Sequence, residues 1–516
     1  MRYLIGLDIG TTGVKGLVID GAGRVVKRAF EGYPLENPRP GWAEQNPADW
    51  WRATVSVLRE LLSQNGAGRE IRAEDIAGIG LSGQMHSSVF LDASGEVVRP
   101  AILWCDVRTS DECRWITAAV GGRERLIELT CNPALEGFTA PKIIWLRDHE
   151  PENFKRVAKV LLPKDYIRYR MTGEMATEVS DAAGTLLFDV AGRRWSRDVL
   201  NALGLNEGMV PPYVESQDVC GRITREVADA TGLLEGTPVV AGGADNTCGA
   251  VGAGIVKEGR VLTSIGSSGV VVAHTDRVMK DPLGRVHTFN HSVPERWYLM
   301  GVMLSAGMSF KWFRDALAAS EKEVERLSGI DAYEILSREA AKVPAGSEGL
   351  IFLPYLTGER TPHADADARG VFFGLNLRHT KAHMARAVME GVVFGLKDSL
   401  EIIKSTGIHV DEVRAIGGGA KSQVWRQIQA DILGVDIVTL NIEEGPAFGA
   451  ALLAGVGVGV YPNVIEAAEN TIKAVTRVSP AQDRQEAYQG YYEIYKDLYV
   501  ALKDNFKKLS RQVQAQ

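Results

Sequence analysis

Two short, glycine-rich turns carry residue types that suit phosphate binding. Each turn lies between two apolar runs, as in a β-hairpin, and each places small hydroxyl side chains beside glycines. A turn without side-chain bulk lets backbone N–H groups and hydroxyls point at phosphate oxygens. The candidate phosphate-binding residues are Thr11, Thr12, Gly266, Ser267 and Ser268. A plain hairpin turn explains either segment alone, but the two together favour phosphate binding.

Asp8, which precedes the first turn, is a candidate magnesium ligand. Mg²⁺ prefers oxygen ligands and keeps several waters, so a single carboxylate can hold it through water. A third glycine-rich segment follows a predicted strand at 413–416 and precedes a predicted helix at 424–433. Its glycines allow a flat ring or a ribose to approach, although helix–strand packing explains them equally well. The candidate nucleotide contacts there are Gly418, Gly419 and Ser422.

Asp245 is the candidate general base. It follows an apolar run at 238–243 that predicts a short strand, and the glycines ahead of it leave room for a ligand. A carboxylate at this place can accept a proton from an alcohol that attacks phosphorus. A helix N-cap aspartate is the alternative, and one residue can fill both roles.

Met85 and His86 end another predicted strand, residues 76–81, and are candidate contacts for a polyol. The alternative for His86 is a buried histidine whose ring nitrogens are satisfied within the protein. The histidines form no HExxH motif or close carboxylate cluster, which argues against a catalytic transition metal.

The elements that position these residues alternate between strands and helices, which indicates an α/β fold. A strand–turn–strand pattern at 3–19 returns at 260–273, so we expect two related halves with a boundary near residue 242. A helix is predicted over 47–64, with Asn46 as its cap and Pro47 in its first turn. The predicted domains are residues 1–242 and 243–516.

Composition excludes several classes of protein. The 516 residues include 58 Lys and Arg against 65 Asp and Glu, a net charge of −7, so no broad cationic surface for nucleic acid or anionic lipid is expected. Five cysteines without zinc-ligand spacing predict buried, reduced thiols. The N-terminus lacks the apolar core of a signal peptide, and no apolar run reaches the length of a membrane span, so a cytoplasmic location is expected.

Tyrosines at helical spacing mark the last part of the chain. We expect this stripe to be a face that docks on the rest of the protein, and not a binding site. Its members are Tyr488, Tyr492, Tyr495, Tyr499 and Leu502.

Two segments, residues 137–149 and 370–390, match family signatures nearly without a break. On these motifs the chain resembles the FGGY carbohydrate kinases of the actin/hexokinase superfamily, over essentially its full length. The resemblance implies two actin/hexokinase-like (ribonuclease H-like) α/β domains that flank a catalytic cleft. The N-terminal domain would hold the sugar, and the C-terminal domain would hold most of the ATP.

The resemblance also implies roles for the residues nominated above. Asp245 would be the catalytic base, Met85 and His86 would contact the sugar, and Asp8 would lie near Mg–ATP. The phosphate-side residues would be Thr11, Thr12, Gly266, Ser267 and Ser268, and the adenosine side would be lined by Gly418, Gly419 and Ser422. The cofactors expected from the family are ATP and Mg²⁺.

The sugar-side segments look most like the branch of the family that phosphorylates D-xylulose. Ser87 departs from that branch, where many members have glycine, so an added hydroxyl lies beside the predicted sugar site. Gluconate kinases share the Met-His pair, and gluconate, ribulose or a related polyol is the alternative substrate. An actin- or chaperone-like ATPase is a further alternative. No nucleic-acid or membrane partner is expected, and the sequence leaves a homodimer open.

Overall fold

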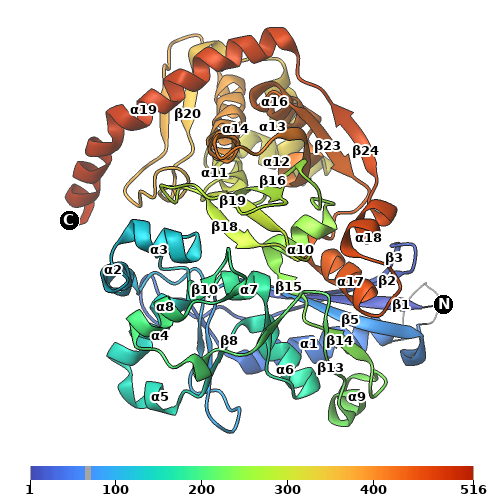
Figure 1. Cartoon of the computed structure of the whole chain (residues 1–516). Coiled ribbons are helices and arrows are strands. Elements are labelled where there is room, and N and C mark those ends of the chain that lie inside the picture. The colour runs from blue at the N-terminus through green and yellow to red at the C-terminus, as the bar shows by residue number, and fades with distance from the viewer. Residues whose placement is uncertain (1, 64–70, 515–516) are drawn as a thin grey trace.

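The computed structural model describes residues 2–63 and 71–514, which form two α/β bodies, one above the other in Figure 1. Each body is built around a seven-stranded sheet, which confirms the predicted architecture. The first sheet contains β1 (Tyr3–Ile9), β2 (Gly13–Asp20), β3 (Val25–Gly32), β5 (Ile76–Gly83), β13 (Val219–Arg222), β14 (Pro238–Val240) and β15 (Gly243–Ala244). The second contains β16 (Gly259–Ile265), β17 (Gly269–Thr275), β18 (His287–Asn290), β19 (Trp297–Met303), β22 (Val410–Gly417), β23 (Asp436–Leu440) and β24 (Ala474–Val478).

The two sheets share one strand plan. In the first, β1, β2 and β3 form an antiparallel meander, and β1 pairs in parallel with β5. In the second, β16, β17 and β19 form the same meander, and β16 pairs in parallel with β22. The β1–β2 and β16–β17 hairpins therefore occupy equivalent places, as the two similar turns in the sequence predict.

Helix α1 (Pro47–Leu62) begins as its sequence predicts. Oδ1 of Asn46 accepts a hydrogen bond from the backbone N of Ala48 at 3.0 Å, and Pro47 lies in the first turn. The predicted end at residue 64 lies outside the described residues. One face of the helix is buried, which explains its apolar spacing. The apolar residues predicted for that face are all buried, namely Trp50, Ala53, Val57, Leu58 and Leu61.

Helices α10 (Asp245–Gly252) and α17 (Gly445–Gly457) lie between the two bodies (Figure 1). Helix α17 packs on β1 and β5 although it comes from the second half of the chain. The approach is so close that a Cβ on Gly6 would lie 1.9 Å from the carbonyl oxygen of Ala447. A Cβ on Gly449 would likewise lie 1.9 Å from the carbonyl oxygen of Cys248 on α10. Glycine is required at both contacts.

The remaining helices pack on the two sheets or on one another. Those of the first body include α2 (Ser110–Ala119), α3 (Arg123–Thr130), α4 (Thr139–His149), α5 (Pro151–Arg156), α6 (Pro163–Thr172), α7 (Val179–Ala183), α8 (Arg197–Leu203) and α9 (Arg225–Thr231). Those of the second include α11 (Gly307–Leu317), α12 (Ala319–Ser328), α13 (Ala332–Ala341), α14 (Lys381–Ser405), α15 (Gly418–Lys421), α16 (Gln423–Leu433) and α18 (Val464–Thr471). In the first body α6 lies against the sheet, whereas α2, α3, α4, α5 and α8 form a separate group beside it (Figure 1).

The long C-terminal helix α19 (Gln482–Gln514) packs along the second body through the predicted stripe. Tyr488, Tyr492 and Tyr495 are buried in the core of that body, and Tyr499 and Leu502 pack against it. The prediction of an intramolecular docking face is therefore confirmed. No helix in the part of the chain that the structure describes is long and apolar enough to span a membrane. The five cysteines are free thiols; Cys105 and Cys220 are half-buried and the others are buried.

Candidate active site

Asp8 lies near the end of β1, where the parallel pairing places it beside Ser82 of β5. Its Oδ1 atom is buried and has no hydrogen-bond partner among the described residues. Burial raises the pKa of Asp8 to about 6, although the hydroxyl of Ser82 and, to a smaller extent, the charge of Lys15 oppose the shift. A buried, unpartnered carboxylate oxygen is costly unless something binds it.

Asp245 reaches the same edge of the sheet through β15. Because β15 pairs in parallel with β5, with Ala244 opposite Gly83, the chain enters α10 beside the ends of β5 and β1. Oδ1 of Asp245 accepts hydrogen bonds from the backbone N of Asn246 at 2.7 Å and from its Nδ2 at 2.9 Å. Burial and the charge of Asp8 raise the pKa of Asp245 to about 7.

Asp245 is not the N-cap of α10. The cap position belongs to Ala244, and Asp245 is the first residue of the helix. Its carboxylate lies in the first turn, where the helix dipole favours negative charge, and only Oδ1 is engaged there, by the backbone N and the Nδ2 of Asn246. The side chain is thus left available for another role.

Met85 and His86 follow β5 and lie beside the Asp245 segment. The Sδ atom of Met85 is 3.4 Å from Nδ2 of Asn246, the residue that also bonds Asp245. Nδ1 of His86 donates to the carbonyl oxygen of Gly184 at 2.6 Å, which leaves Nε2 as an acceptor. Burial lowers the pKa of His86 to about 3, so the ring is neutral. A neutral imidazole with a free acceptor suits a sugar hydroxyl.

The first predicted phosphate turn closes the β1–β2 hairpin. The backbone N of Gly10 donates to the carbonyl oxygen of Gly13 at 3.1 Å. The hydroxyl of Thr11 accepts from Nε1 of Trp104 at 2.9 Å, while the side chain of Thr12 is exposed. Thr11 is therefore held by Trp104, whereas Thr12 faces solvent.

The second phosphate turn closes the β16–β17 hairpin and is exposed throughout. Gly266, Ser267 and Ser268 are all exposed, and the backbone N of Gly266 donates to the carbonyl oxygen of Ser268 at 3.0 Å. The carbonyl oxygen of Ser267 accepts from the backbone N of Met308 at 3.1 Å, which ties the turn to α11. The two serine hydroxyls have no partner among the described residues and are free to bind a ligand.

The third glycine segment opens α15 and α16. Gly418 is exposed, whereas Gly419 is buried against Ile265, whose side chain would lie 2.7 Å from an added Cβ. The hydroxyl of Ser422 caps α16 by accepting from the backbone N of Trp425 at 3.3 Å. Of the three candidates, only Gly418 is exposed. Gly419 packs in the interior and Ser422 caps a helix, so either would have to contact a nucleotide in addition to its structural role.

The carboxylates fit a magnesium ion held mainly by water and phosphate. No group of three or more acidic, histidine or cysteine side chains within the described residues forms a metal cage. Mg²⁺ is usually held by one or two carboxylates together with substrate phosphates. The orphaned Oδ1 of Asp8, with the charge of Asp245 acting on the same region, matches that donor set.

Three residues in this region were not nominated from the sequence, namely Gln84, Trp104 and Asn246. Gln84 donates to the carbonyl oxygen of Gly10, and Trp104 bonds Thr11, so both link the sugar segment to the first phosphate turn. The position of Asn246 directly after Asp245 could have indicated its role. Trp104, in contrast, lies 93 residues from Thr11 in the sequence. No local pattern reveals a contact of that range.

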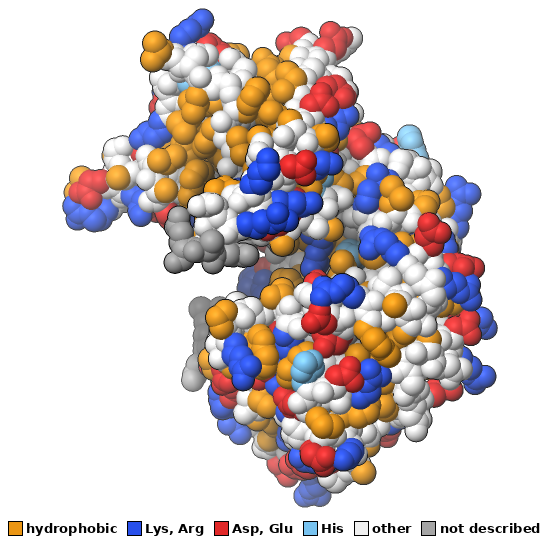
Figure 2. All heavy atoms as spheres, turned by 90° about the vertical axis from the view of Figure 1, so that its left-hand side faces the viewer, with side chains coloured by type: hydrophobic (Ala, Val, Ile, Leu, Met, Phe, Trp, Pro, Cys, Tyr) orange, Lys and Arg blue, Asp and Glu red, His pale blue; other side chains and the backbone are white. Residues whose placement is uncertain are grey.

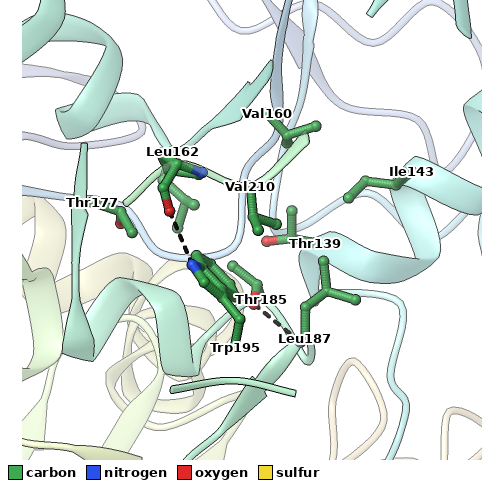
Figure 3. Close-up of a pocket in the computed structure, with 10 residues that line it drawn as sticks. Thr139, Ile143, Val160, Leu162, Thr177, Thr185, Leu187, Trp195 and Val210 are labelled. Atoms are coloured by element: carbon green, nitrogen blue, oxygen red, sulfur yellow. Dashed lines mark hydrogen bonds between the residues drawn. The ribbon is translucent and has the colours of Figure 1, made fainter. Parts of the chain in front are cut away.

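A small cavity behind the sugar segment is not the substrate site. Figure 3 shows its lining, which includes Thr139, Thr185 and Trp195. Its volume is about 10 Å³, room for about one water, whereas ligand sites occupy several hundred. Trp195 closes it by donating from Nε1 to the carbonyl oxygen of Pro211 at 2.9 Å. The cavity is a packing void.

Two similarly built α/β domains, with hydroxyl-rich hairpin turns and two carboxylates at the strand ends, define a phosphotransferase of the two-domain sugar kinase type. The chain belongs to the FGGY family of carbohydrate kinases. Residues 3–252 match the N-terminal domain of that family, and residues 261–458 match the C-terminal domain.

Named relatives agree with this assignment. The chain is 44% identical to the xylulose kinase of Bacillus subtilis (strain 168) over 489 residues, 95% of each protein. It is 30% identical to the gluconokinase of the same organism, over 94% of this chain and 93% of the relative. The ligand-bound xylulose kinase from Lactobacillus acidophilus superposes with a TM-score of 0.91 at 28% identity, covering 99% of this chain and all of the other.

Proposed function

We propose that the protein transfers the γ-phosphoryl group of ATP to the C5 hydroxyl of D-xylulose, which gives D-xylulose 5-phosphate and ADP. The observation that carries phosphoryl transfer to a sugar is the contact of Asn246 with both Asp245 and Met85. It places a carboxylate with a raised pKa beside the segment that contains His86. The choice of substrate is supported by the comparisons. The chain is 44% identical to the xylulose kinase of Bacillus subtilis but only 30% identical to the gluconokinase of the same organism.

In this proposal Asp245 is the general base. The free Oδ2 atom accepts the proton of the C5 hydroxyl as the oxygen attacks the γ-phosphorus. His86 orients the sugar by accepting a hydrogen bond from a hydroxyl at Nε2, because Nδ1 already donates to Gly184. Met85 supplies the apolar floor beside the base.

The two hairpin turns would hold the phosphates from opposite sides. The exposed hydroxyls of Ser267 and Ser268 have no partner in the described chain, so they can donate to phosphate oxygens, and Gly266 adds no side chain that would block the approach. Thr11 and Thr12 would act from the first domain, with Asp8 as the residue that holds Mg²⁺. When bound, that ion would neutralise charge on the phosphates.

Closure of the two domains would keep water from the reacting phosphorus. Figure 2 shows the molecular surface hollowed between the two bodies. Sugar kinases must exclude water, because a water molecule in place of the hydroxyl hydrolyses ATP. Gly418, Gly419 and Ser422 would line the adenosine side of the second domain. A cytoplasmic location, a homodimer and the domain boundary at 242 stay predictions.

One observation favours a sugar acid as the alternative substrate. Burial is the main cause of the lowered pKa of His86, and the nearby positive charges of Lys142 and Arg360 add to the shift. However, Lys142 already donates to the carbonyl oxygens of Glu136, Gly137 and Phe138. That leaves Arg360 as the group that would bind a carboxylate such as that of gluconate.

The test is ADP release in a coupled assay with Mg–ATP across D-xylulose, D-ribulose, L-ribulose, gluconate and glycerol. A strong preference for D-xylulose is expected. Preference for gluconate would overturn the substrate and retain the kinase mechanism. ATP turnover that no sugar stimulates would overturn the mechanism itself in favour of an ATPase that drives conformational change.

A further inference from the structure

A cluster of charged side chains is buried in the first domain, and none of its members is among the residues proposed to bind substrate. Nζ of Lys164 lies 2.8 Å from Oδ1 of Asp165, 2.9 Å from Oδ2 of Asp181 and 3.3 Å from Oε1 of Glu178. All four side chains are fully buried. Although burial lowers the pKa of Lys164, the three carboxyls raise it above its usual value, so the lysine stays charged. A cluster of this kind resists rearrangement, because breaking the contacts of Lys164 would leave its buried charge without a partner.

The cluster holds one end of the short helix α7. Glu178 caps α7 by accepting from the backbone N of Ser180 at 2.7 Å and of Asp181 at 2.8 Å. Lys164 fixes Glu178 in turn, and the hydroxyl of Ser216 donates to the other oxygen of Glu178 at 3.0 Å. Helix α7 is thus tied to the cluster at its first turn.

Two hydrogen bonds run from α7 to the two sides of the candidate active site. The hydroxyl of Ser180 donates to Glu178 at 2.8 Å and accepts from the backbone N of Ala244 at 3.0 Å. Ala244 directly precedes the proposed base. At the other end of the helix, the carbonyl oxygen of Gly184 accepts from Nδ1 of His86 at 2.6 Å.

The short segment between β14 and β15, which leads to Asp245, is held in place by several contacts. Nη1 of Arg168 donates to the carbonyl oxygen of Ala241 at 2.8 Å, and the backbone N of Gly242 donates to the carbonyl oxygen of Ser216. Gly242 has φ +79°, and an added Cβ would lie 1.8 Å from the carbonyl oxygen of Leu81. Arg168 also bonds Asp165, so the segment before Asp245 and helix α7 are both anchored to the same buried cluster.

We propose that α7 sets the distance between Asp245 and His86, and that Ser180 is the positioning residue that ties the base to it. This inference rests on the proposed function of the site. Reacting groups must be held within about 0.5 Å of their productive geometry, and a misplacement of about 1 Å can cost on the order of 10² in rate. One short helix bonded to His86 and to the residue that precedes Asp245 fixes that distance more firmly than two separate supports.

The test is Ser180→Ala, with Ser216→Ala as the matched control. Both variants remove a buried hydroxyl that donates to Glu178, but only Ser180 also holds Ala244. For Ser180→Ala we expect kcat to fall about 10- to 100-fold with the KM for ATP unchanged. Ser216→Ala should lower the unfolding temperature to a similar extent and leave kcat within about twofold of the wild type.

A second variant reaches the same hydrogen bond from the other side. Ala244→Pro removes the N–H that donates to Ser180, and the φ of −54° at Ala244 is compatible with proline. Wild-type kcat in either folded variant, or an equal loss of kcat in Ser216→Ala, would overturn the proposal. Each assay uses the sugar that the wild-type enzyme prefers in the panel, so an error in the assigned substrate does not affect this outcome.

Discussion

Asn246 donates two hydrogen bonds to a single carboxylate oxygen of Asp245, from its backbone N and from Nδ2. Both bonds favour the charged form of Asp245, whereas burial and the charge of Asp8 disfavour it and together raise the pKa to about 7. The other oxygen, Oδ2, has no partner among the described residues. The pKa of this carboxylate therefore lies near 7 and one of its oxygens is free, as a general base requires.

The first prediction concerns pH. A base must be ionised to accept a proton, so kcat/KM for the sugar should fall as pH drops below about 7, where Asp245 becomes protonated. Asn246→Ala removes one bond to the charged form and should move this acid limb upward by about one pH unit. The measurement is the pH profile of kcat/KM. Asn201→Ala, at an exposed asparagine on α8, is the control, and an unmoved limb in Asn246→Ala would contradict the assignment.

The second prediction concerns the base itself. Asp245→Asn keeps the shape of the side chain but cannot take the proton, so activity should fall by about 10² to 10⁴. ATP should still bind, which calorimetry can measure. Asp229→Asn, at an exposed residue of α9, should leave both properties unchanged. Normal turnover in Asp245→Asn would show that another group accepts the proton.

Much of this site was readable from the sequence because its turns are local. The hairpins at Gly10–Gly13 and Gly266–Gly269 follow from apolar runs interrupted by glycine and hydroxyl residues, and both form as predicted. Asp245 was readable as a carboxylate at the end of a predicted strand. Helix α1 begins at its predicted cap for the same reason, since the signals lie within a few residues.

The contacts that assemble the site were not readable, because they depend on strand pairing. Asp8 and Asp245 are brought together only because β1 and β15 flank β5. The support of Ala244 by Ser180 joins residues 64 positions apart and is visible only in three dimensions.

The third prediction concerns sugar binding by His86. Its ring is neutral and donates from Nδ1 to Gly184, so Nε2 can accept one sugar hydroxyl. His86→Ala should raise the KM for the sugar about 10-fold, the loss expected for about one well-formed hydrogen bond, and leave ATP affinity nearly intact. His409→Ala, at an exposed histidine, is the control. Loss of ATP binding in His86→Ala would contradict the assignment of His86 to the sugar site.

The last prediction concerns Ser87, the position where the sequence departs from the D-xylulose branch. Its hydroxyl is buried, donates to Oε1 of Gln84 at 3.1 Å and accepts from the backbone N of Trp104 at 3.0 Å. Both bonds lie within the protein, so this hydroxyl supports the wall of the site and does not read the sugar. Ser87→Ala should therefore leave the ratio of kcat/KM for D-xylulose and gluconate unchanged.

Stability should change instead. Ser87→Ala leaves the N–H of Trp104 without its acceptor, which should lower the free energy of unfolding by about 1–3 kcal/mol. The neighbouring Ser88 is a matched control, because it is equally buried and its hydroxyl has no partner among the described residues. Ser88→Ala should be neutral or stabilising in thermal unfolding. A change of sugar preference in Ser87→Ala at unchanged stability would mean that the Ser87 hydroxyl turns toward the substrate when the sugar binds.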